Sequence, residues 1–314
     1  MVKNIFDLAS VHLGKAGDGT VVKPYETPDE VDPGLLVPIP RSINRADYNI
    51  NNLDFYGSDV WNCYETSFLL DNGFPVSGVL VVSYPSDSPN IVESKSLKLY
   101  LNSYNMMKLG HDKLTAQKLF VNMVKNHLTN CIFNTIGAGG YPAVNARFFI
   151  NSQTPNTVYP FNTQFVSLES LVDVSSVVFD NFNEDPSILK TQTYLTKNTQ
   201  LFHSCSLRSN CRVTNQPDWG DVYVYVKGNS VVSPESLLQY IVSMRKENHF
   251  HEEICEMMYK RLSTMLSPDE LMVACLYTRR GGIDINPIRA SDIRVFSKMI
   301  NNYSGLMFNK TMRQ

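Results

Sequence analysis

Residues 60–84, VWNCYETSFLLDNGFPVSGVLVVSY, decide the fold class of this chain. In the first part large residues alternate with small or polar ones, and an apolar run returns after Asp71-Asn72-Gly73. Alternation with a period of two is typical of a β-strand, and Asn-Gly supplies the positive φ angles that a tight turn requires. The stretch therefore predicts a β-hairpin.

Helical and strand-like patterns follow this hairpin. The segments ESKSLKLYLNSYNMMKL (93–109) and LTAQKLFVNMVKNHLTNCIF (114–133) have helical patterns, and NARFFINS (145–152) resembles a strand. In the second helix, apolar residues recur at helical spacing. These residues are Leu119, Met123, Val124 and Leu128.

The second half of the chain repeats this order of elements. GDVYVYVKGNSVV (220–232) predicts a strand, a Gly-Asn turn and a returning strand. Ser233-Pro234 is typical of a helix start, with Ser as N-cap and Pro at the first helical position. Residues 236–244 and 251–266 then have helical patterns, and residues 270–278 predict a closing strand.

The repeated order predicts an α+β fold built from two copies of one module. Each copy is expected to be an antiparallel sheet with two helices on one face. We expect an N-terminal arm at residues 1–55, a first module at 56–160 and a second module at 161–314. The boundary is predicted in the polar segment SQTPNTVYPFNTQ, at residues 152–164.

Composition narrows the class of protein. The chain has 314 residues, 43% hydrophobic and 18% charged, which is typical of a globular protein with a substantial core. A formal net charge of −2 disfavours nucleic acid or an anionic membrane as partner. Apolar runs fall short of the about 20 residues of a membrane helix, and no signal-peptide pattern is present. We expect a cytoplasmic chain whose six cysteines are free thiols without a CxxC metal site.

The segment SNCRVTNQPDWGD, residues 209–221, sets Cys211 among polar neighbours and seven positions before Asp218. A thiolate is a strong nucleophile, and a nearby carboxylic acid can protonate the atom that the attack makes basic. A polar loop with an incidental cysteine is the other interpretation, because most thiols are unreactive. His203 could act as a base partner or be a surface histidine.

The segment IVESKSLKLY, which begins at Ile91, combines a helix start with two lysines. Ser94 or Ser96 is expected as the N-cap, so that Lys95 and Lys98 lie near a helix N-terminus, where a phosphate can bind. An amphipathic helix with solvated lysines is the alternative. Glu93, beside the cap, is a candidate acceptor for two N–H donors of a guanine-like ring.

Two further clusters carry polar residues of interest. His249 and His251 invite a metal site, but residues at i and i+2 point to different sides of a helix and cannot bind one ion. A solvated acid-rich helix start and a substrate contact both remain open there. Arg279-Arg280 beside Gly281-Gly282 suits anion binding at the end of a strand, and a charged turn is the alternative.

Together these motifs resemble a known family. ESKSLKLYLNSYN, SNCRVTNQPDWG, FHE and YTRRGGIDINP are similar, in this order, to the NADPH-dependent 7-cyano-7-deazaguanine reductases. These enzymes are the nitrile reductases of queuosine biosynthesis, here in their long two-module form. ESKSLKLY separates them from relatives that share only the fold, such as metal-dependent GTP cyclohydrolases. The resemblance extends from PRSINR to RGGIDINP and so covers nearly the whole chain.

The resemblance implies a fold, a cofactor and site residues. The family fold is the tunnelling fold, with two tandem modules per chain and a homodimer as the expected assembly. Cys211 matches the nucleophile that forms a covalent thioimide, and Asp218 matches the general acid; no metal is implied. The positions that contact the substrate in the family match Val92, Glu93, Ser94, His251 and Glu252. The positions that contact NADPH match Ser94, Lys95, Arg280 and Gly281.

The implied reaction converts the nitrile of 7-cyano-7-deazaguanine to an aminomethyl group with two hydrides. Thiolate addition creates a carbon that accepts hydride more readily than a nitrile does, and enclosure protects the imine from hydrolysis. Two alternatives belong to other classes. One is a thioimide-forming transferase without reduction, which should lack ESKSLKLY. The other is a non-catalytic purine- or pterin-binding protein, which has no need of a cysteine with an acid in register.

Overall fold

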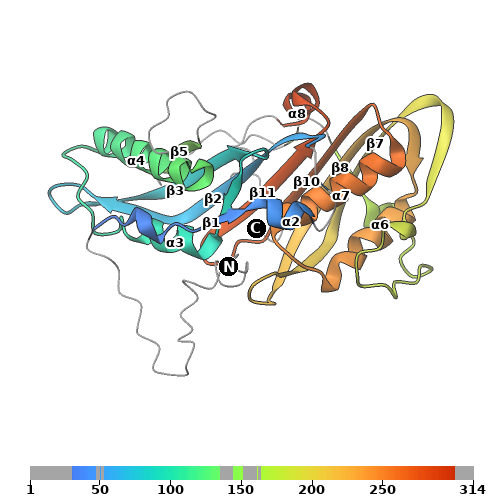
Figure 1. Cartoon of the computed structure of the whole chain (residues 1–314), viewed down its shortest axis with the longest axis horizontal. Coiled ribbons are helices and arrows are strands. Elements are labelled where there is room, and N and C mark those ends of the chain that lie inside the picture. Colours follow the sequence, from blue (N-terminus) through green and yellow to red (C-terminus); the bar gives the residue numbers. More distant parts are fainter. Residues whose placement is uncertain are drawn as a thin grey trace. The chain divides into compact units, whose positions relative to one another are not determined.

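The computed structural model describes residues 30–46, 50, 53–134, 144–150, 161 and 164–300 (Figure 1). Most of the expected N-terminal arm and of the 152–164 boundary segment lies outside the described residues. The chain divides into two compact units. Unit 1 comprises Met1–Asp47, Trp61–Asn156 and Arg280–Ile283, and unit 2 comprises Tyr48–Val60, Thr157–Arg279 and Asp284–Gln314.

The predicted hairpin of residues 60–84 is confirmed. Strands β2 (Tyr56–Leu69) and β3 (Pro75–Pro85) are neighbours, and the Gly73 N–H donates to the carbonyl of Leu70 at 2.8 Å. Gly73 has a φ of 84°, the left-handed conformation that the Asn-Gly turn predicted. In unit 1, β3 also pairs antiparallel with β5 (Asn145–Ile150), and the short strands β1 (Pro38–Pro40) and β4 (Asn90–Val92) pair with each other.

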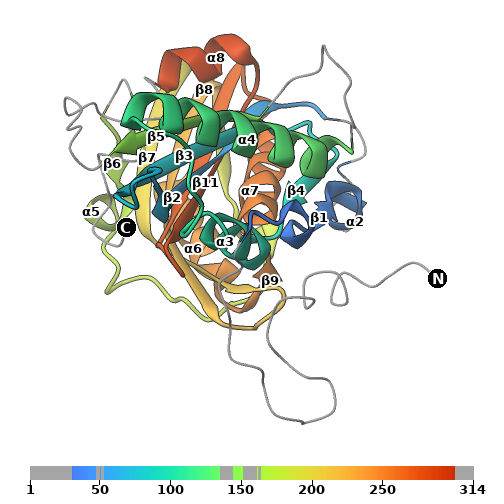
Figure 2. The ribbon, with the colours of Figure 1, turned by 90° about the vertical axis from the view of Figure 1, so that its left-hand side faces the viewer.

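Two main helices complete unit 1, and α4 lies over β5 and β3 (Figure 2). They are α3 (Ser94–Asn102) and α4 (Lys113–Phe133), and the short elements η1 (Pro33–Leu35) and α2 (Arg41–Ala46) precede them. Leu119, one of the apolar residues at helical spacing, is 45% exposed. The buried residues recur every four positions: Ala116, Phe120, Val124, Leu128 and Ile132.

In unit 2 the strand order runs from the first residues of β2 to β11 (Ile283–Ala290), β10 (Glu270–Tyr277), β8 (Pro217–Val232), β7 (Thr191–Cys211) and β6 (Val166–Ser167). Neighbouring strands are antiparallel from β11 to β7, whereas β6 and β9 (Asn248–His249) run parallel to β7. The α+β class predicted from the sequence is confirmed by these antiparallel sheets and their helices.

Helices α6 (Pro234–Ser243) and α7 (His251–Leu266) cover one face of the strands of unit 2 (Figure 1). They share one apolar core with inward side chains of β7, β8 and β10. Shorter elements are α5 (Leu168–Leu171), η2 (Pro186–Ile188), η3 (Met244–Lys246) and α8 (Ile293–Met299). Among the described residues, no helix combines the length and the apolar composition needed to cross a bilayer.

The turn predicted at Gly228-Asn229 is wrong. Strand β8 continues through this dipeptide, paired with β7 at Asn198↔Gly228. Glycine at this position allows a close approach instead, because an added Cβ would lie 3.2 Å from the Cα of Pro268. The hairpin of this half is instead formed by β7 and β8. Its turn lies within residues 212–216, where Asn215 has a φ of 57°.

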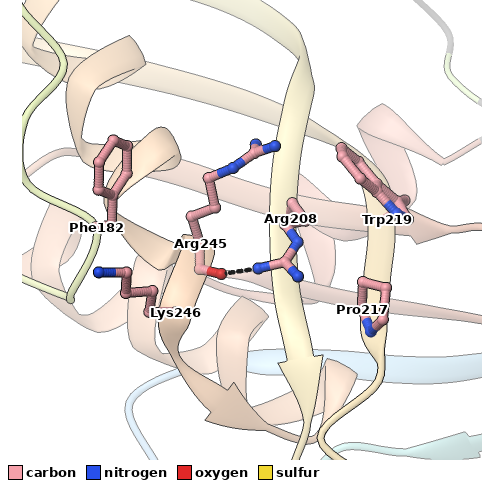
Figure 3. Close-up of a pocket in the computed structure, with 6 residues that line it drawn as sticks. All are labelled: Phe182, Arg208, Pro217, Trp219, Arg245 and Lys246. Atoms are coloured by element: carbon pink, nitrogen blue, oxygen red, sulfur yellow. Dashed lines mark hydrogen bonds between the residues drawn. The ribbon is translucent and has the colours of Figure 1, made fainter.

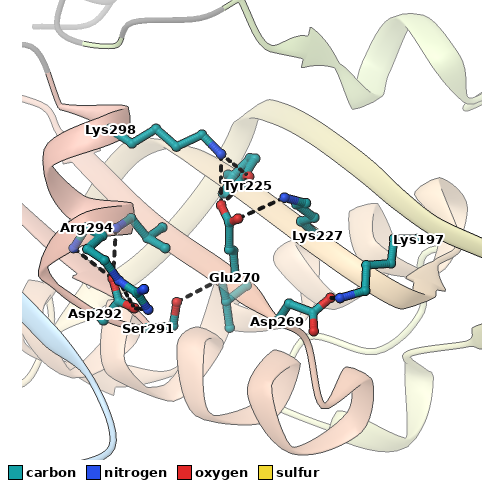
Figure 4. Close-up of polar contacts among 11 residues, drawn as sticks. Lys197, Tyr225, Lys227, Asp269, Glu270, Ser291, Asp292, Arg294 and Lys298 are labelled. Atoms are coloured by element: carbon teal, nitrogen blue, oxygen red, sulfur yellow. Dashed lines mark hydrogen bonds and ion pairs between the residues drawn. The ribbon is translucent and has the colours of Figure 1, made fainter.

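A polar network joins α8 to the strands of unit 2 (Figure 4). The carboxylate of Glu270 accepts from Lys298 at 2.8 Å, from Tyr225 at 2.7 Å and from Lys227 at 3.0 Å. Hydrogen bonds from Lys298, Tyr225 and Lys227 outweigh burial and lower the pKa of Glu270 to about 2. The charged carboxylate therefore holds three side chains together, and α8 is tied through one of them.

We predict that Glu270→Gln lowers stability near pH 7 by about 0.5–1 kcal/mol, as expected for a solvent-screened network. Because the pKa of Glu270 is depressed on folding, its contribution is present above pH ~4.5 and is lost as the pH falls toward 2. Urea unfolding at pH 7 and pH 3 should therefore show a difference from the unmodified protein that shrinks at the lower pH. Asp269→Asn, in a single exposed pair with Lys197, is the matched control. An equal difference at both pH values would contradict the assignment.

Candidate active site

The β7–β8 hairpin brings Cys211 and Asp218 to one face. Ser209 lies directly opposite Asp218, and Cys211 is two residues beyond Ser209 on the same strand. Since side chains alternate along a strand, Cys211 and Asp218 project from the same face as diagonal neighbours. The tight turn is held by the Cys211 N–H donating to Gln216 and the Asn215 N–H donating to Cys211, at 2.8 and 2.9 Å.

Cys211 and Asp218 differ in their access to solvent. The side chain of Cys211 is partly exposed and not in a disulfide, whereas Asp218 is only 2% exposed. A reachable thiol therefore stands beside a carboxyl group that is largely shielded from water. This is the arrangement that nucleophilic addition followed by proton transfer requires.

The start of α7 contributes His251 and Glu252 to the same region. Nε2 of His251 lies 3.6 Å from Oδ1 of Asp218, and Glu252 is 3% exposed. The ring of His251 packs edge-on against Tyr277, with 4.0 Å between ring centroids. The structure thus groups Cys211, Asp218, His251 and Glu252 in unit 2.

Tyr277 and Gly220 support His251 and were not predicted from the sequence. Tyr277 of β10 is fully buried and pairs across the strands with Gly220 of β8. A Cβ at Gly220 would lie 3.1 Å from the ring of Tyr277 and 3.0 Å from the carbonyl oxygen of Leu276. The glycine of the PDWG motif therefore makes room for the ring against which His251 packs.

A second unpredicted feature is an ionic brace around His249. Its Nε2 lies 2.9 Å from Glu247 and its Nδ1 lies 3.2 Å from Glu253. The same oxygen of Glu253 accepts from the Phe250 N–H at 3.1 Å and from Arg212 at 3.3 Å. The brace joins the residue after Cys211 to strand β9 and to the first turn of α7.

The brace keeps His249 charged. Burial lowers the pKa of His249, but hydrogen bonds to Glu247 and Glu253 outweigh it and raise the pKa to about 9. The sequence argument treated His249 and His251 as two positions of one helix, and for His249 this is wrong. His249 ends β9, and only His251 lies in α7. The backbone is extended at His249 because β9 pairs with the end of β7 at Cys211.

His203 belongs to the opposite face of the hairpin. Its Nε2 lies 3.1 Å from Oδ1 of Asp221, and its ring stacks on Tyr223 at a centroid distance of 4.6 Å. Eight residues of β-strand also separate it from Cys211, a distance of about 26 Å at ~3.3 Å per residue. His203 is therefore not the base partner of Cys211.

Unit 1 carries the second group of predicted residues. The prediction that Ser94 or Ser96 is the N-cap of α3 is wrong. The N-cap is Glu93. Its two carboxylate oxygens accept from the N–H groups of Lys95 at 3.0 Å and Ser96 at 2.7 Å. Glu93 is 9% exposed and follows the buried Val92, while Ser94 and Lys95 face solvent.

The Arg280-Gly281-Gly282 turn also belongs to unit 1. Gly281 and Gly282 have φ angles of 56° and 79°, and Arg280 exchanges backbone hydrogen bonds with Ile283. A Cβ at Gly281 would lie 3.5 Å from Nζ of Lys98, and one at Gly282 would lie 2.5 Å from the carboxyl carbon of Glu65. The glycines therefore let the turn approach the lysine-bearing side of α3, where backbone and cations together can receive an anion.

We predict that His249→Gln destabilises the protein by about 2 kcal/mol at pH 6. A histidine whose pKa is raised on folding contributes fully below the unfolded pKa, about 6.5, and the contribution disappears as the pH rises through 9. The urea midpoint of His249→Gln should therefore lie below that of the unmodified protein at pH 6, less far below it at pH 7.5, and close to it at pH 9.5. His111→Gln, whose side chain is 95% exposed, is the control and should change stability little. A constant difference across this pH range would refute the charged brace.

Comparison with known proteins identifies the family. The family model described as "Nitrile reductase, 7-cyano-7-deazaguanine-reductase N-term" matches residues 27–137, and the model "QueF-like protein" matches residues 217–294. A curated NADPH-dependent 7-cyano-7-deazaguanine reductase from Legionella pneumophila (strain Lens) is 38% identical over 270 residues, 85% of this chain and 88% of the relative. The one from Colwellia psychrerythraea is 35% identical over 296 residues, 93% of this chain and 95% of the relative.

Among solved structures, the apo form of the archaeosine synthase QueF-Like aligns with 33% of this chain and 95% of its own. Its TM-score is 0.26 and its sequence identity 16%, values too low to establish a common fold. The curated relatives cover nearly the whole chain at well over 30% identity, and the resemblance found in the sequence is thereby confirmed. The chain belongs to the family of the NADPH-dependent 7-cyano-7-deazaguanine reductases.

Proposed function

We propose that this chain reduces the nitrile of 7-cyano-7-deazaguanine to the aminomethyl group of 7-aminomethyl-7-deazaguanine, with NADPH as the reductant. The proposal rests on the family and on one observation in unit 2. The observation is that a tight hairpin sets the partly exposed thiol of Cys211 and the buried carboxyl of Asp218 on one face. The product would enter queuosine or related deazapurine biosynthesis.

Cys211 is the proposed nucleophile and Asp218 the proposed acid. The partly exposed thiol of Cys211 releases its proton to solvent. The resulting thiolate sulfur forms a bond to the nitrile carbon, the triple bond becomes a double bond, and the nitrogen takes the proton of Asp218. The result is a thioimide joined to Cys211, with Asp218 left as a carboxylate. Nε2 of His251 lies 3.6 Å from Oδ1 of Asp218, close enough to stabilise the carboxylate that results, and the ring of Tyr277 packs against the imidazole.

Buried acceptors would recognise the heterocycle. Glu93 and Glu252, at 9% and 3% exposure, accept from the N–H and amino groups of the deazaguanine, and Val92, Ser94 and His251 line the same substrate. A ring that lacked those donors would not form these hydrogen bonds, which costs binding free energy. Capping by Glu93 fixes its orientation, so little conformational entropy is lost when it binds.

The cofactor would be held by Ser94, Lys95, Arg280 and Gly281. The observation that fits a phosphate-bearing cofactor is the positive-φ turn at Gly281, which approaches Lys98, beside the exposed N-terminal turn of α3. NADPH supplies the two hydrides that convert a nitrile to an amine. The side chains of Lys95 and Arg280 balance its phosphate charge, and the glycine allows close backbone approach.

We further propose two tandem tunnelling-fold modules, at residues 56–160 and 161–314, and a cytoplasmic homodimer that acts on a small molecule. The order of elements supports the duplication. In one half the hairpin β2–β3 is followed by α3, α4 and β5, and in the other β7–β8 is followed by α6, α7 and β10.

We predict that Cys211→Ala abolishes both turnover and covalent adduct formation but leaves substrate binding within about threefold. Intact-protein mass spectrometry with 7-cyano-7-deazaguanine, without cofactor, should show the mass of one added substrate on the unmodified protein only. Loss of reduced-nicotinamide absorbance should correspond to about two cofactors per substrate.

Asp218→Asn and Cys205→Ala complete the test of the site. Asp218→Asn should slow adduct formation at least about 100-fold while binding persists, because the proton source is removed. Cys205 lies on the same strand β7 and is likewise partly exposed, so Cys205→Ala should keep both adduct and turnover. Absence of an adduct on the unmodified protein, or its persistence in Cys211→Ala, would overturn the proposed function.

A further inference from the structure

A cavity lies beside the β7–β8 hairpin in unit 2, and none of its lining residues is among the proposed substrate or cofactor contacts. It has a volume of about 440 Å³ and is lined by Phe182, Arg208, Pro217, Trp219, Arg245 and Lys246 (Figure 3). Arg208 and Trp219 are directly opposite each other on β7 and β8, one position from the Ser209↔Asp218 pair. Because side chains alternate, they project from the face opposite to Asp218.

Three cations meet at this cavity without acidic partners. Among the described residues, no carboxylate lies within salt-bridge distance of Arg208, Arg245 or Lys246. The neighbouring carboxylate of Glu247 is engaged by His249 and by the Glu184 N–H. Three uncompensated positive charges around one cavity raise its potential and favour an anionic ligand.

Aromatic rings form the other walls. The guanidinium carbons of Arg245 and Arg208 lie 5.2 and 5.9 Å from the ring centroid of Trp219. Nζ of Lys246 lies 5.7 Å from the ring centroid of Phe182. Guanidinium groups stacked near an indole keep their N–H edges available for oxygen atoms, and their planes can receive a further planar ring.

The cationic side chains stand on backbone that is held in place. A side-chain N–H of Arg208 donates to the carbonyl of Arg245 (Figure 3). The Lys246 N–H donates to Phe182 at 2.9 Å, and the Asn210 N–H donates to Glu247 at 2.8 Å. The segment that carries Arg245 and Lys246 is therefore bound both to β7 and to the loop of Phe182. Such preorganisation lowers the entropic cost of binding.

We propose that this cavity binds a phosphate monoester carried on a planar ring, as in a nucleotide. Two guanidinium groups can hold a phosphate through paired hydrogen bonds, and Trp219 with the guanidinium planes can stack on the base. A volume of about 440 Å³ is within the range of small-ligand sites. The ligand could be a free nucleotide or the 2′-phosphoadenosine end of a dinucleotide, and the experiment distinguishes these sources.

Fluorescence of Trp219 reports occupancy. The chain has two tryptophans, and Trp61 is 1% exposed in unit 1, so Trp61→Phe leaves Trp219 as the reporter. Titration of the full-length Trp61→Phe protein with adenosine 2′-monophosphate should quench emission saturably below about 1 mM. Adenosine, which lacks the phosphate, and inorganic phosphate, which lacks the ring, should each bind at least about tenfold more weakly.

Variants test whether the cations carry the binding. Arg245→Gln removes one guanidinium but keeps the carbonyl that Arg208 uses, and it should weaken binding at least about tenfold. Lys190→Gln, on an exposed residue of unit 2, is the matched control and should leave binding unchanged. NADP⁺ that competes where NAD⁺ does not would assign the site to the dinucleotide phosphate. Competition by neither would assign it to a free nucleotide.

The result is independent of catalysis, because the titrations need no substrate and can be repeated in Cys211→Ala. No saturable quenching by adenosine 2′-monophosphate up to about 5 mM, or equal affinity of Arg245→Gln and the parent protein, would overturn the proposal. If Trp61→Phe does not fold, isothermal titration calorimetry of the unmodified chain with the same ligands and the same Arg245→Gln comparison gives the same decision.

Discussion

The buried charge of Arg289 is the constraint on which the rest of unit 2 depends. Its side chain is 0% exposed and lies 2.8 Å from both Asp59 and Glu256. Burial opposes the charge, but Asp59 and Glu256 outweigh it and raise the pKa of Arg289. Removing one member of such a buried pair typically costs about 3–5 kcal/mol, since it leaves a charge without compensation. The triad therefore fixes three elements against one another: the start of β2, the strand β11 and the helix α7.

The position of α7 determines where His251 lies relative to Cys211 and Asp218. Glu256 lies in the second turn of this helix, so the first turn, with His251, is held at a defined place over the strands. The brace of His249 and Glu253 then attaches that turn to the end of β7, where Cys211 lies. A thiol, a carboxyl group and an imidazole from three different elements are thus held in position by ionic contacts among other residues.

The two faces of the β7–β8 hairpin have different chemistry. One face carries the thiol and the buried carboxyl of Asp218, and the other carries Arg208 and Trp219 with unpaired cations beside them. Neighbouring residues on a strand differ in function here because the pleat sends alternate side chains to opposite sides. A ligand on the cationic face would therefore lie on the same two strands that carry Cys211 and Asp218.

Local patterns in the sequence were sufficient for the elements whose signals are local. Alternation and Asn-Gly determined the β2–β3 hairpin, and periodicity determined α4, α7 and β10. The sequence motifs also identified the family. Tertiary structure decided what depends on distant partners. Gly228 is explained by close approach to Pro268 and not by a turn, and Glu93 caps α3 because β4 presents its carboxylate to two free N–H groups. The packing of Tyr277 against Gly220 and the burial of Arg289 between Asp59 and Glu256 join residues up to 230 positions apart. No sequence window contains both partners of such contacts, so only the folded chain could place them.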